Sequence, residues 1–533
     1  MDPKLVVVHL FALLIVALLR TSSAQAFEVI THEKLSFRSV DTTVSSPSKL
    51  DGYLREILRH DFYSDEGIQL GIQQLFNGKI VRDWIQFGSG EEDNPWMRLN
   101  EHFHDPTKPW DQAGTLGISS VIWSQLLNQG NGVGGGNHSW PDARESYFRA
   151  LTETDPAQRK QYWADTFQSV GNLIHLVQDA ASPAHTRNDL HLSFKGFGNT
   201  DRLHVWGESK LGLAKVDNSG SQSYDSSILS LPPNNFAPIP IARIIDTEKL
   251  RAGIPSEGLD IGIAEYSNAN FFSDDTIFSP SYQAPTDLGF IAETGPNGKL
   301  TQYLYRHPGS SGGTPYKLAI ASSLADSVTL PFWQQQWALD DKVMESYAEK
   351  LFPRAIGYSA GMIDYFFRGK IDTTPWPTGY VLVPWSQRPT SILVENVSVK
   401  VDETNEQGGQ GTMRLVLVYR SKYEGTPSEG PEVVVSQPVS VNASSQPQTV
   451  VFSFDSLPFP STAPDISGSY IYQYSGILVY KGVLGQESEA VVGAGYCFDP
   501  SNGSRYDRVY QLEHSVPGLW FDEGAAYIDY LGC

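Results

Sequence analysis

The sequence predicts a multidomain protein, an all-α domain followed by an all-β sandwich. The chain has 533 residues, more than a single hydrophobic core usually holds. In the first part of the chain, apolar residues recur at spacings of three and four, as on one face of a helix. Beyond about residue 375, apolar and polar residues alternate and β-branched residues are enriched, which is typical of strands. We therefore predict a helical domain over 27–374 and a β-sandwich over 375–533.

The first 26 residues have the pattern of a secretory signal peptide. Lys4 precedes an apolar run over 5–19, and Ala24-Gln25-Ala26 forms an A-x-A cleavage motif. The apolar run is shorter than the ~20 residues of a membrane-spanning helix, and no later segment reaches that length. We expect cleavage after Ala26, a secreted or periplasmic protein, and no transmembrane segment in the mature chain.

The helical domain is predicted to be organised around a helix over 157–181. His175 and Asp179 stand four residues apart in an apolar run and therefore share one helix face. Burying charged groups without partners is costly, so they form either a satisfied polar pair or part of a metal site. Pro183 cannot continue the helix, and His185 follows directly after this predicted break.

Most histidines of the mature chain lie in its first part. Nine of eleven fall between His32 and His204, and His204 with Glu208 repeats the i, i+4 spacing of His175 and Asp179. Signal cleavage would free the amine of Phe27, with an ordinary pKa of about 8. The amine and carbonyl of Phe27 could then bind a metal together with His32. Alternatively, this stretch is a frayed terminus with a surface histidine.

The ordered set of these residues resembles the superfamily of zinc-dependent phospholipases C and fungal-type single-strand-specific nucleases. The set consists of Phe27, His32, Asp93, His102, His175, Asp179, His185, His204 and Glu208. The segment His102-Phe103-His104-Asp105-Pro106 is similar to the HFYDP box of the phospholipase branch. The segment Leu203-His204-Val205-Trp206 is more similar to the nuclease branch, whereas Glu208 is the carboxylate of the phospholipase branch. The resemblance covers roughly residues 27–210.

The resemblance implies an all-α catalytic domain with three zinc ions. The first ion would be held by Asp93, His102, His175 and Asp179, and the second by His185, His204 and Glu208. The third would be held by Phe27 and His32 together with Asp179, which would bridge the first and third ions. Phe27 stands where the family usually has tryptophan, but its binding atoms belong to the backbone. Two alternatives stay open: Glu92 in place of Asp93, and His191 in place of His204. Asp93 would also serve as the catalytic general base.

The implied activity is hydrolysis of phosphodiesters. We expect a phospholipase C-type enzyme that releases diacylglycerol and a phosphorylated head group from phospholipid, with peripheral contact to the membrane. One alternative is a single-strand nuclease or other phosphoesterase with the same zinc cluster. Another is a non-enzymatic, metal-stabilised binding protein. The net charge of −21 excludes a nonspecific polyanion binder, which needs a basic surface, and weighs against a nucleic-acid partner.

The remainder of the helical domain is expected to contain a loop-rich elaboration over 211–330 and two helices within 332–367, separated by Pro353. The strands of the sandwich are predicted at 391–401, 412–420, 432–435, 449–454 and 470–480. We expect the two domains to have separate cores, so that a fragment ending near Lys370 would fold alone. Cys497 and Cys533 either form one disulfide or stay free.

Overall fold

The computed structural model describes most of the chain outside its two ends. The described residues are 29–62, 70–115, 117–130, 135–190, 201–254, 257–294, 300–307, 314–321, 337–373, 379–380, 391–400, 408–423, 432–443, 446–455 and 470–497. The predicted signal peptide, Phe27, His191 and Cys533 lie outside these ranges.

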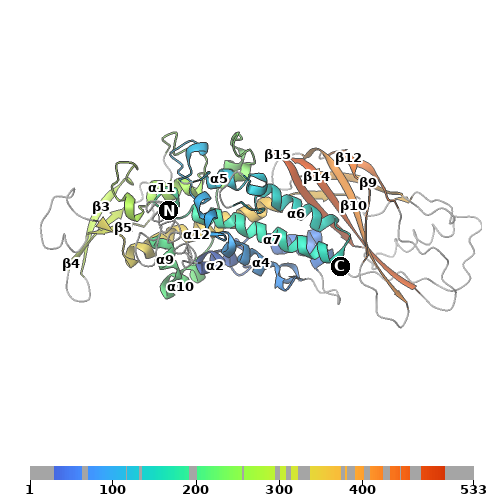
Figure 1. The fold of residues 1–533 in the computed structure, drawn as a ribbon, viewed down its shortest axis with the longest axis horizontal. Helices are drawn as coiled ribbons and strands as arrows, with labels where there is room; N and C mark the ends of the chain where they lie inside the picture. The colour runs from blue at the N-terminus through green and yellow to red at the C-terminus, as the bar shows by residue number, and fades with distance from the viewer. Residues whose placement is uncertain are drawn as a thin grey trace, which may run out of the picture.

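The first part of the chain is helical, as predicted (Figure 1). Its principal helices are α2 (Val29–Val40), α4 (Val81–Glu91), α6 (Trp140–Thr152), α7 (Pro156–Asp179), α8 (Pro183–Thr186), α9 (Arg202–Glu208), α10 (Lys210–Asn218), α11 (Ile263–Asn270) and α12 (Asp341–Phe366). Shorter elements are α3 (Leu50–Gly52), α5 (Ser120–Trp123), a π-helical turn η1 (Tyr53–Leu58), several 3-10 turns, among them η4 (Trp96–Glu101), and the two-residue strands β1 (Leu75–Phe76) and β2 (Lys79–Ile80). None of the described helices is both long and apolar enough to cross a membrane.

Helix α7 is the central helix of this domain and confirms the predicted 157–181 helix to within two residues at each end. Asp155 caps its N-terminus by accepting hydrogen bonds from the N–H groups of Ala157 and Gln158. From Leu173 onward every side chain of the helix is buried. The helix ends at Asp179, and Pro183 begins the short helix α8, which carries His185.

Helix α12 differs from the prediction, because Pro353 lies inside one continuous helix. A proline in a helix interior removes a hydrogen bond and costs about 3 kcal/mol. Tyr347 and Leu351 before the proline and Ile356 after it are all buried in the same core. Packing of both halves on that core offsets the local cost, so the helix continues through the proline.

The segment expected to be loop-rich contributes three strands to a small antiparallel sheet, and the fourth strand comes from residues 337–338, which were predicted to be helical. Its strands β3 (Leu288–Thr294), β4 (Leu300–Arg306), β5 (Tyr316–Ala321) and β6 (Trp337–Ala338) pair in that order. Leu318 of β5 is buried, and its carbonyl accepts a hydrogen bond from the hydroxyl of Tyr347 on α12 at 2.8 Å. The sheet is therefore anchored on the helical core.

The C-terminal part is a β-sandwich, as predicted. The larger sheet has the order β11-β10-β14-β15 with β12 beside β10, and the smaller has the order β13-β9-β7 with β8 beside β9. Their bounds are β7 (Lys370–Asp372), β8 (Gly379–Tyr380), β9 (Ser391–Lys400), β10 (Gly408–Tyr423), β11 (Glu432–Val435), β12 (Val439–Asn442), β13 (Gln448–Ser453), β14 (Tyr470–Leu484) and β15 (Glu487–Cys497). Val397, Leu415 and Leu478 are among the residues that form the core between the sheets.

The second face of the larger sheet packs on the helical domain (Figure 1). Val416, Ile477 and Val491 belong to the same buried cluster as Tyr147 and Leu151 of α6. The expectation of two separate cores is therefore wrong on this face. A fragment ending near Lys370 would expose the apolar helical surface that the sheet covers.

A buried ion cluster joins the two parts at this interface. The carboxylate of Glu487 on β15 accepts hydrogen bonds from Trp140 Nε1 at 2.7 Å, Arg144 Nε at 2.7 Å and Arg368 Nη1 at 2.6 Å. Burial alone would raise the pKa of Glu487, but the charges of Arg144 and Arg368 outweigh it and lower this pKa to about 2. The carboxylate thus stays ionised in the folded protein.

We predict that Glu487→Gln destabilises the protein and makes its stability depend less on pH below about pH 4.5. The folded-state pKa lies below the ordinary value of 4.5, so the stabilisation is complete above pH 4.5 and is lost as the pH falls toward 2. This difference corresponds to about 3 kcal/mol. Thermal melting between pH 2 and 7 would measure it. Glu489→Gln, on the same strand with an exposed side chain, is the control and should retain the wild-type profile; equal profiles for all three proteins would contradict the prediction.

Candidate metal centre

Imidazoles and carboxylates from four helices and three connecting segments converge beside the C-terminal end of α7. They are His32 of α2, Asp93 after α4, His102 after η4, His175 and Asp179 of α7, His185 of α8, Asp201 before α9 and His204 of α9. Their ligand atoms form three groups, each with all atoms within 4.8 Å of one another: Asp93, His102 and His175; His185, Asp201 and His204; and His32, Asp179 and His204. Each group could hold a metal ion.

The first group contains three of the four residues predicted for the first ion, and the fourth, Asp179, faces two of them. Asp93 Oδ1 lies 3.2 Å from His102 Nδ1 and 3.6 Å from His175 Nε2. Asp179 Oδ2 lies 2.9 Å from His102 Nδ1 and 3.1 Å from His175 Nε2. Two carboxylates thus face the same two imidazoles.

The second group contains the predicted His185 and His204 but a carboxylate that sequence analysis missed. Asp201 Oδ2 lies 3.2 Å from His204 Nδ1 and 4.0 Å from His185 Nε2. The expected carboxylate, Glu208, is half-buried and belongs to none of the three groups. Asp201 precedes His204 by three residues, which is the only sequence signal that could have indicated it.

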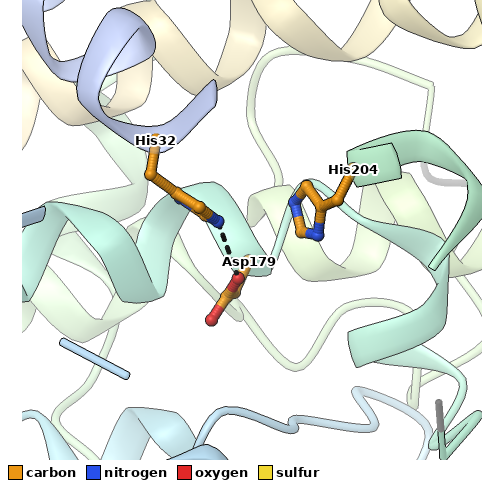
Figure 2. A group of neighbouring side chains, drawn as sticks. All are labelled: His32, Asp179 and His204. Atoms are coloured by element: carbon orange, nitrogen blue, oxygen red, sulfur yellow. Dashed lines mark ion pairs between the residues drawn. The ribbon is translucent and has the colours of Figure 1, made fainter. Parts of the chain in front are cut away.

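The third group places His32 beside the other oxygen of Asp179, at 3.5 Å, as Figure 2 shows. The ring of His32 also stacks on that of His175, with centroids 4.0 Å apart. His204 completes this group as well as the second. A neutral imidazole has one lone pair, so His204 can serve one of these two groups at a time. The predicted ligand Phe27 lies outside the described residues.

Hydrogen bonds at Nδ1 orient three of the imidazoles. Nδ1 lies 2.7 Å from the Ser89 carbonyl oxygen in His175, 3.3 Å from the His102 carbonyl oxygen in His185, and 2.8 Å from Gln178 Oε1 in His32. Each acceptor requires a proton on Nδ1, which leaves the lone pair on Nε2. In metal-binding histidines, the ring nitrogen that does not bind the metal usually donates a hydrogen bond of this kind.

Several buried polar atoms of the centre make no hydrogen bond within the described part of the chain. They are Nε2 of His32 and His175, Oδ1 of Asp93 and both carboxylate oxygens of Asp179. Unsatisfied buried polar atoms are costly and rare in native proteins. Nitrogen and oxygen ligands at such spacing fit a divalent transition-metal ion, zinc foremost.

The pKa shifts of His32 and Asp179 favour the protonation states that metal binding requires. Burial, together with neighbouring imidazoles, lowers the pKa of His32 well below its ordinary value, so the ring is neutral. Burial would raise the pKa of Asp179, but the surrounding histidines outweigh it and lower that pKa strongly. Burial raises the pKa of Asp93 to about 6, and a cation would counteract this effect. Burial would lower the pKa of His102, but the carboxylates of Asp179 and Glu92 outweigh it and raise that pKa to about 10, so a metal ion has to displace a proton there.

Two polar residues near the centre have other partners. Glu92 pairs with Arg98 and accepts hydrogen bonds from Asn172 and Trp123. Its Oε1 atom lies 3.7 Å from His102 Nε2, whereas Asp93 faces the imidazoles of both His102 and His175. This arrangement favours Asp93 over the alternative Glu92. His104 of the HFHDP segment bonds to Ser119 Oγ and Asp246 rather than to the metal-binding groups.

The position of His175 depends on a close contact between α4 and α7. A Cβ atom added at Gly171 would lie 2.2 Å from the Ile85 carbonyl oxygen, and one at Gly88 would lie 2.0 Å from the Gln168 carbonyl oxygen. Only glycines allow the two helix backbones to approach so closely. This approach brings the Ser89 carbonyl within hydrogen-bonding distance of His175.

The comparisons with known proteins give weak similarities. No protein-family model matches the sequence, and no curated protein matches it either. Among solved structures, the chain is similar to Clostridium perfringens alpha-toxin from an avian strain, with a TM-score of 0.27, 11% identity, and 88% of this chain and 96% of that chain covered. For the alpha toxin from Clostridium absonum, the TM-score is 0.26 and the identity 12%, with 87% of this chain and 97% of that chain covered. Scores this low do not establish a shared activity.

We predict that Gly171→Ala lowers both stability and metal binding. The added methyl group must separate α4 from α7, because it meets backbone atoms that cannot rotate away, and such overpacking costs about 1–3 kcal/mol. Thermal melting and metal analysis after dialysis against zinc would measure the two effects. Gly52→Ala is the control, since an added Cβ there meets nothing within 4 Å. A Gly171→Ala protein with wild-type melting and metal content would contradict the prediction.

Proposed function

We propose that the chain is a secreted, zinc-dependent phosphodiester hydrolase that cleaves phospholipid into diacylglycerol and a phosphorylated head group. The observation that carries the proposal is the convergence of imidazoles and carboxylates in three groups. Within the described residues, Nε2 of His32 and His175 and both carboxylate oxygens of Asp179 make no hydrogen bond. The predicted ligands His32, Asp93, His102, His175, Asp179, His185 and His204 all lie in this cluster. The predicted ligand Glu208 lies outside the three groups, and Phe27 lies outside the described residues.

Zinc ions in such a site would neutralise phosphoryl charge and lower the pKa of a bound water toward 7. Asp93 is suited to the role of general base. Its side chain retains 10% exposure, whereas those of His102 and Asp179 have none. A water entering the centre therefore meets Asp93 first, and this carboxylate can accept its proton.

Exposed apolar side chains on the segments that carry the ligands are compatible with a lipid substrate. Ile30, Trp96 and Val205 are each more than two-fifths exposed. They stand on the segments that carry His32, Asp93 and His204. A nucleic acid would favour cationic side chains around the site in addition to an exposed aromatic ring such as that of Trp96, and Arg98, the basic residue beside Glu92, is buried in an ion pair.

The proposal is tested by assaying the zinc-loaded mature protein on phosphatidylcholine vesicles and on single-stranded DNA. We expect release of diacylglycerol and phosphocholine, its loss on chelation, and its recovery with zinc. His175→Ala should reduce the rate at least ~100-fold, as loss of a metal-anchoring contact does. Asp165→Asn, on the same helix but hydrogen-bonded to Gln161, should retain the rate.

The other outcomes separate the alternatives. Cleavage of DNA with intact lipid would assign the centre to a nuclease. Stoichiometric zinc binding without hydrolysis of either substrate would overturn the enzymatic proposal and leave a metal-stabilised binding protein.

We also predict that the third ion depends on signal cleavage, because the proposed ligands from Phe27 are its free amine and its carbonyl. Protein with one extra residue before Phe27 should bind about one zinc fewer and turn over more slowly, since a metal near the leaving group stabilises developing charge. Phe27→Trp should be nearly neutral, because only backbone atoms bind. Metal analysis and rates at equal thermal stability would measure this. Equal zinc content and rate for the trimmed and extended proteins would contradict the N-terminal ligand.

A further inference from the structure

The carboxylate that faces His204 in the structure is Asp201, whereas Glu208 was expected in that position from the sequence. We infer that Asp201, and not Glu208, is the carboxylate ligand of the ion that His185 and His204 hold. This inference rests on the proposed zinc centre, but its test measures bound metal and not phospholipid cleavage.

The burial of the Asp201 side chain and the direction in which it points both favour Asp201 as the ligand. Its side chain is 2% exposed, and its Oδ2 atom lies 3.2 Å from His204 Nδ1 and 4.0 Å from His185 Nε2. An ion placed among these three atoms would be bound by two nitrogens and one oxygen, a set that catalytic zinc sites use. Asp179 Oδ1 lies 3.6 Å from His185 Nε2 but is not a member of this group.

The two carboxylate oxygens of Asp201 make different contacts. Oδ1 accepts hydrogen bonds from the N–H groups of Leu203, at 2.9 Å, and His204, at 3.3 Å, and so caps helix α9. Oδ2 faces the imidazoles and accepts a hydrogen bond from the hydroxyl of Ser182, which itself caps helix α8. One carboxylate therefore ties together the N-termini of the two helices that carry His185 and His204.

Glu208 contacts another helix, α2. Its carboxyl group accepts a hydrogen bond from the backbone N–H of Ile30, in the first turn of α2. The first N–H groups of a helix lack partners within that helix, so Glu208 satisfies one of them. Through this contact Glu208 anchors α2, which carries His32, and it lies outside the group that contains Asp201.

The experiment counts metal ions in three variants of the full mature chain. Asp201→Ser and Asp201→Asn both keep a side chain that caps a helix well but remove the carboxylate. Glu208→Gln keeps an oxygen that accepts the bond from Ile30 and removes the charge. Each protein is loaded with cobalt(II) or zinc and dialysed, and the metal content, the visible cobalt absorption and the melting temperature are recorded.

We expect both Asp201 variants to bind one ion fewer than wild type, with a changed cobalt spectrum, and Glu208→Gln to bind the wild-type number. Loss of an ion in Glu208→Gln with full occupancy in the Asp201 variants would overturn the inference. Full occupancy in all three variants would overturn it as well. If wild type binds its ions and loses one with Asp201→Asn but cleaves no phospholipid, the proposed function fails while the ligand assignment stands. If the serine variant unfolds, the asparagine variant decides.

Discussion

The contact between Gly88 of α4 and Gly171 of α7 is the constraint on which the metal centre depends. The helix backbones touch there, and the Ser89 carbonyl receives the Nδ1 proton of His175 as a result. The same contact places the end of α4, and Asp93 after it, opposite Asp179 at the end of α7. Two carboxylates and an imidazole thus owe their positions to a glycine pair that contributes no ligand.

The charge balance of the centre explains how an acidic protein could attract an anionic substrate. Asp93, Asp179 and Asp201 contribute three negative charges to the centre, and its imidazoles contribute none when they bind a metal in their neutral form. Two or three divalent cations would exceed this charge and leave a positive site within a chain of net charge −21. The local field near the phosphoryl group would then depend on the bound ions rather than on lysine or arginine side chains.

The β-sandwich is part of the same folded body as the centre. The larger sheet covers α6 with apolar residues, and Glu487 satisfies Arg144, Arg368 and the indole of Trp140 in a region without water access. An ion cluster of this kind fixes one docking orientation, because any shift would leave buried charges unpaired. The sheet therefore holds α6, and through it the packing of α7, in place.

The sequence by itself determined the helical and sandwich parts, the central helix with His175 and Asp179 on one face, and most of the residues that converge there. These features follow from periodicity and local spacing, which depend on neighbours along the chain. Only the tertiary structure decided that α12 continues through Pro353, that a sheet packs on it, and that Asp201 rather than Glu208 faces His185. Each of these outcomes depends on contacts between distant segments: burial on a shared core outweighs the cost of a proline, and the direction of a carboxylate is set by the helix end it caps.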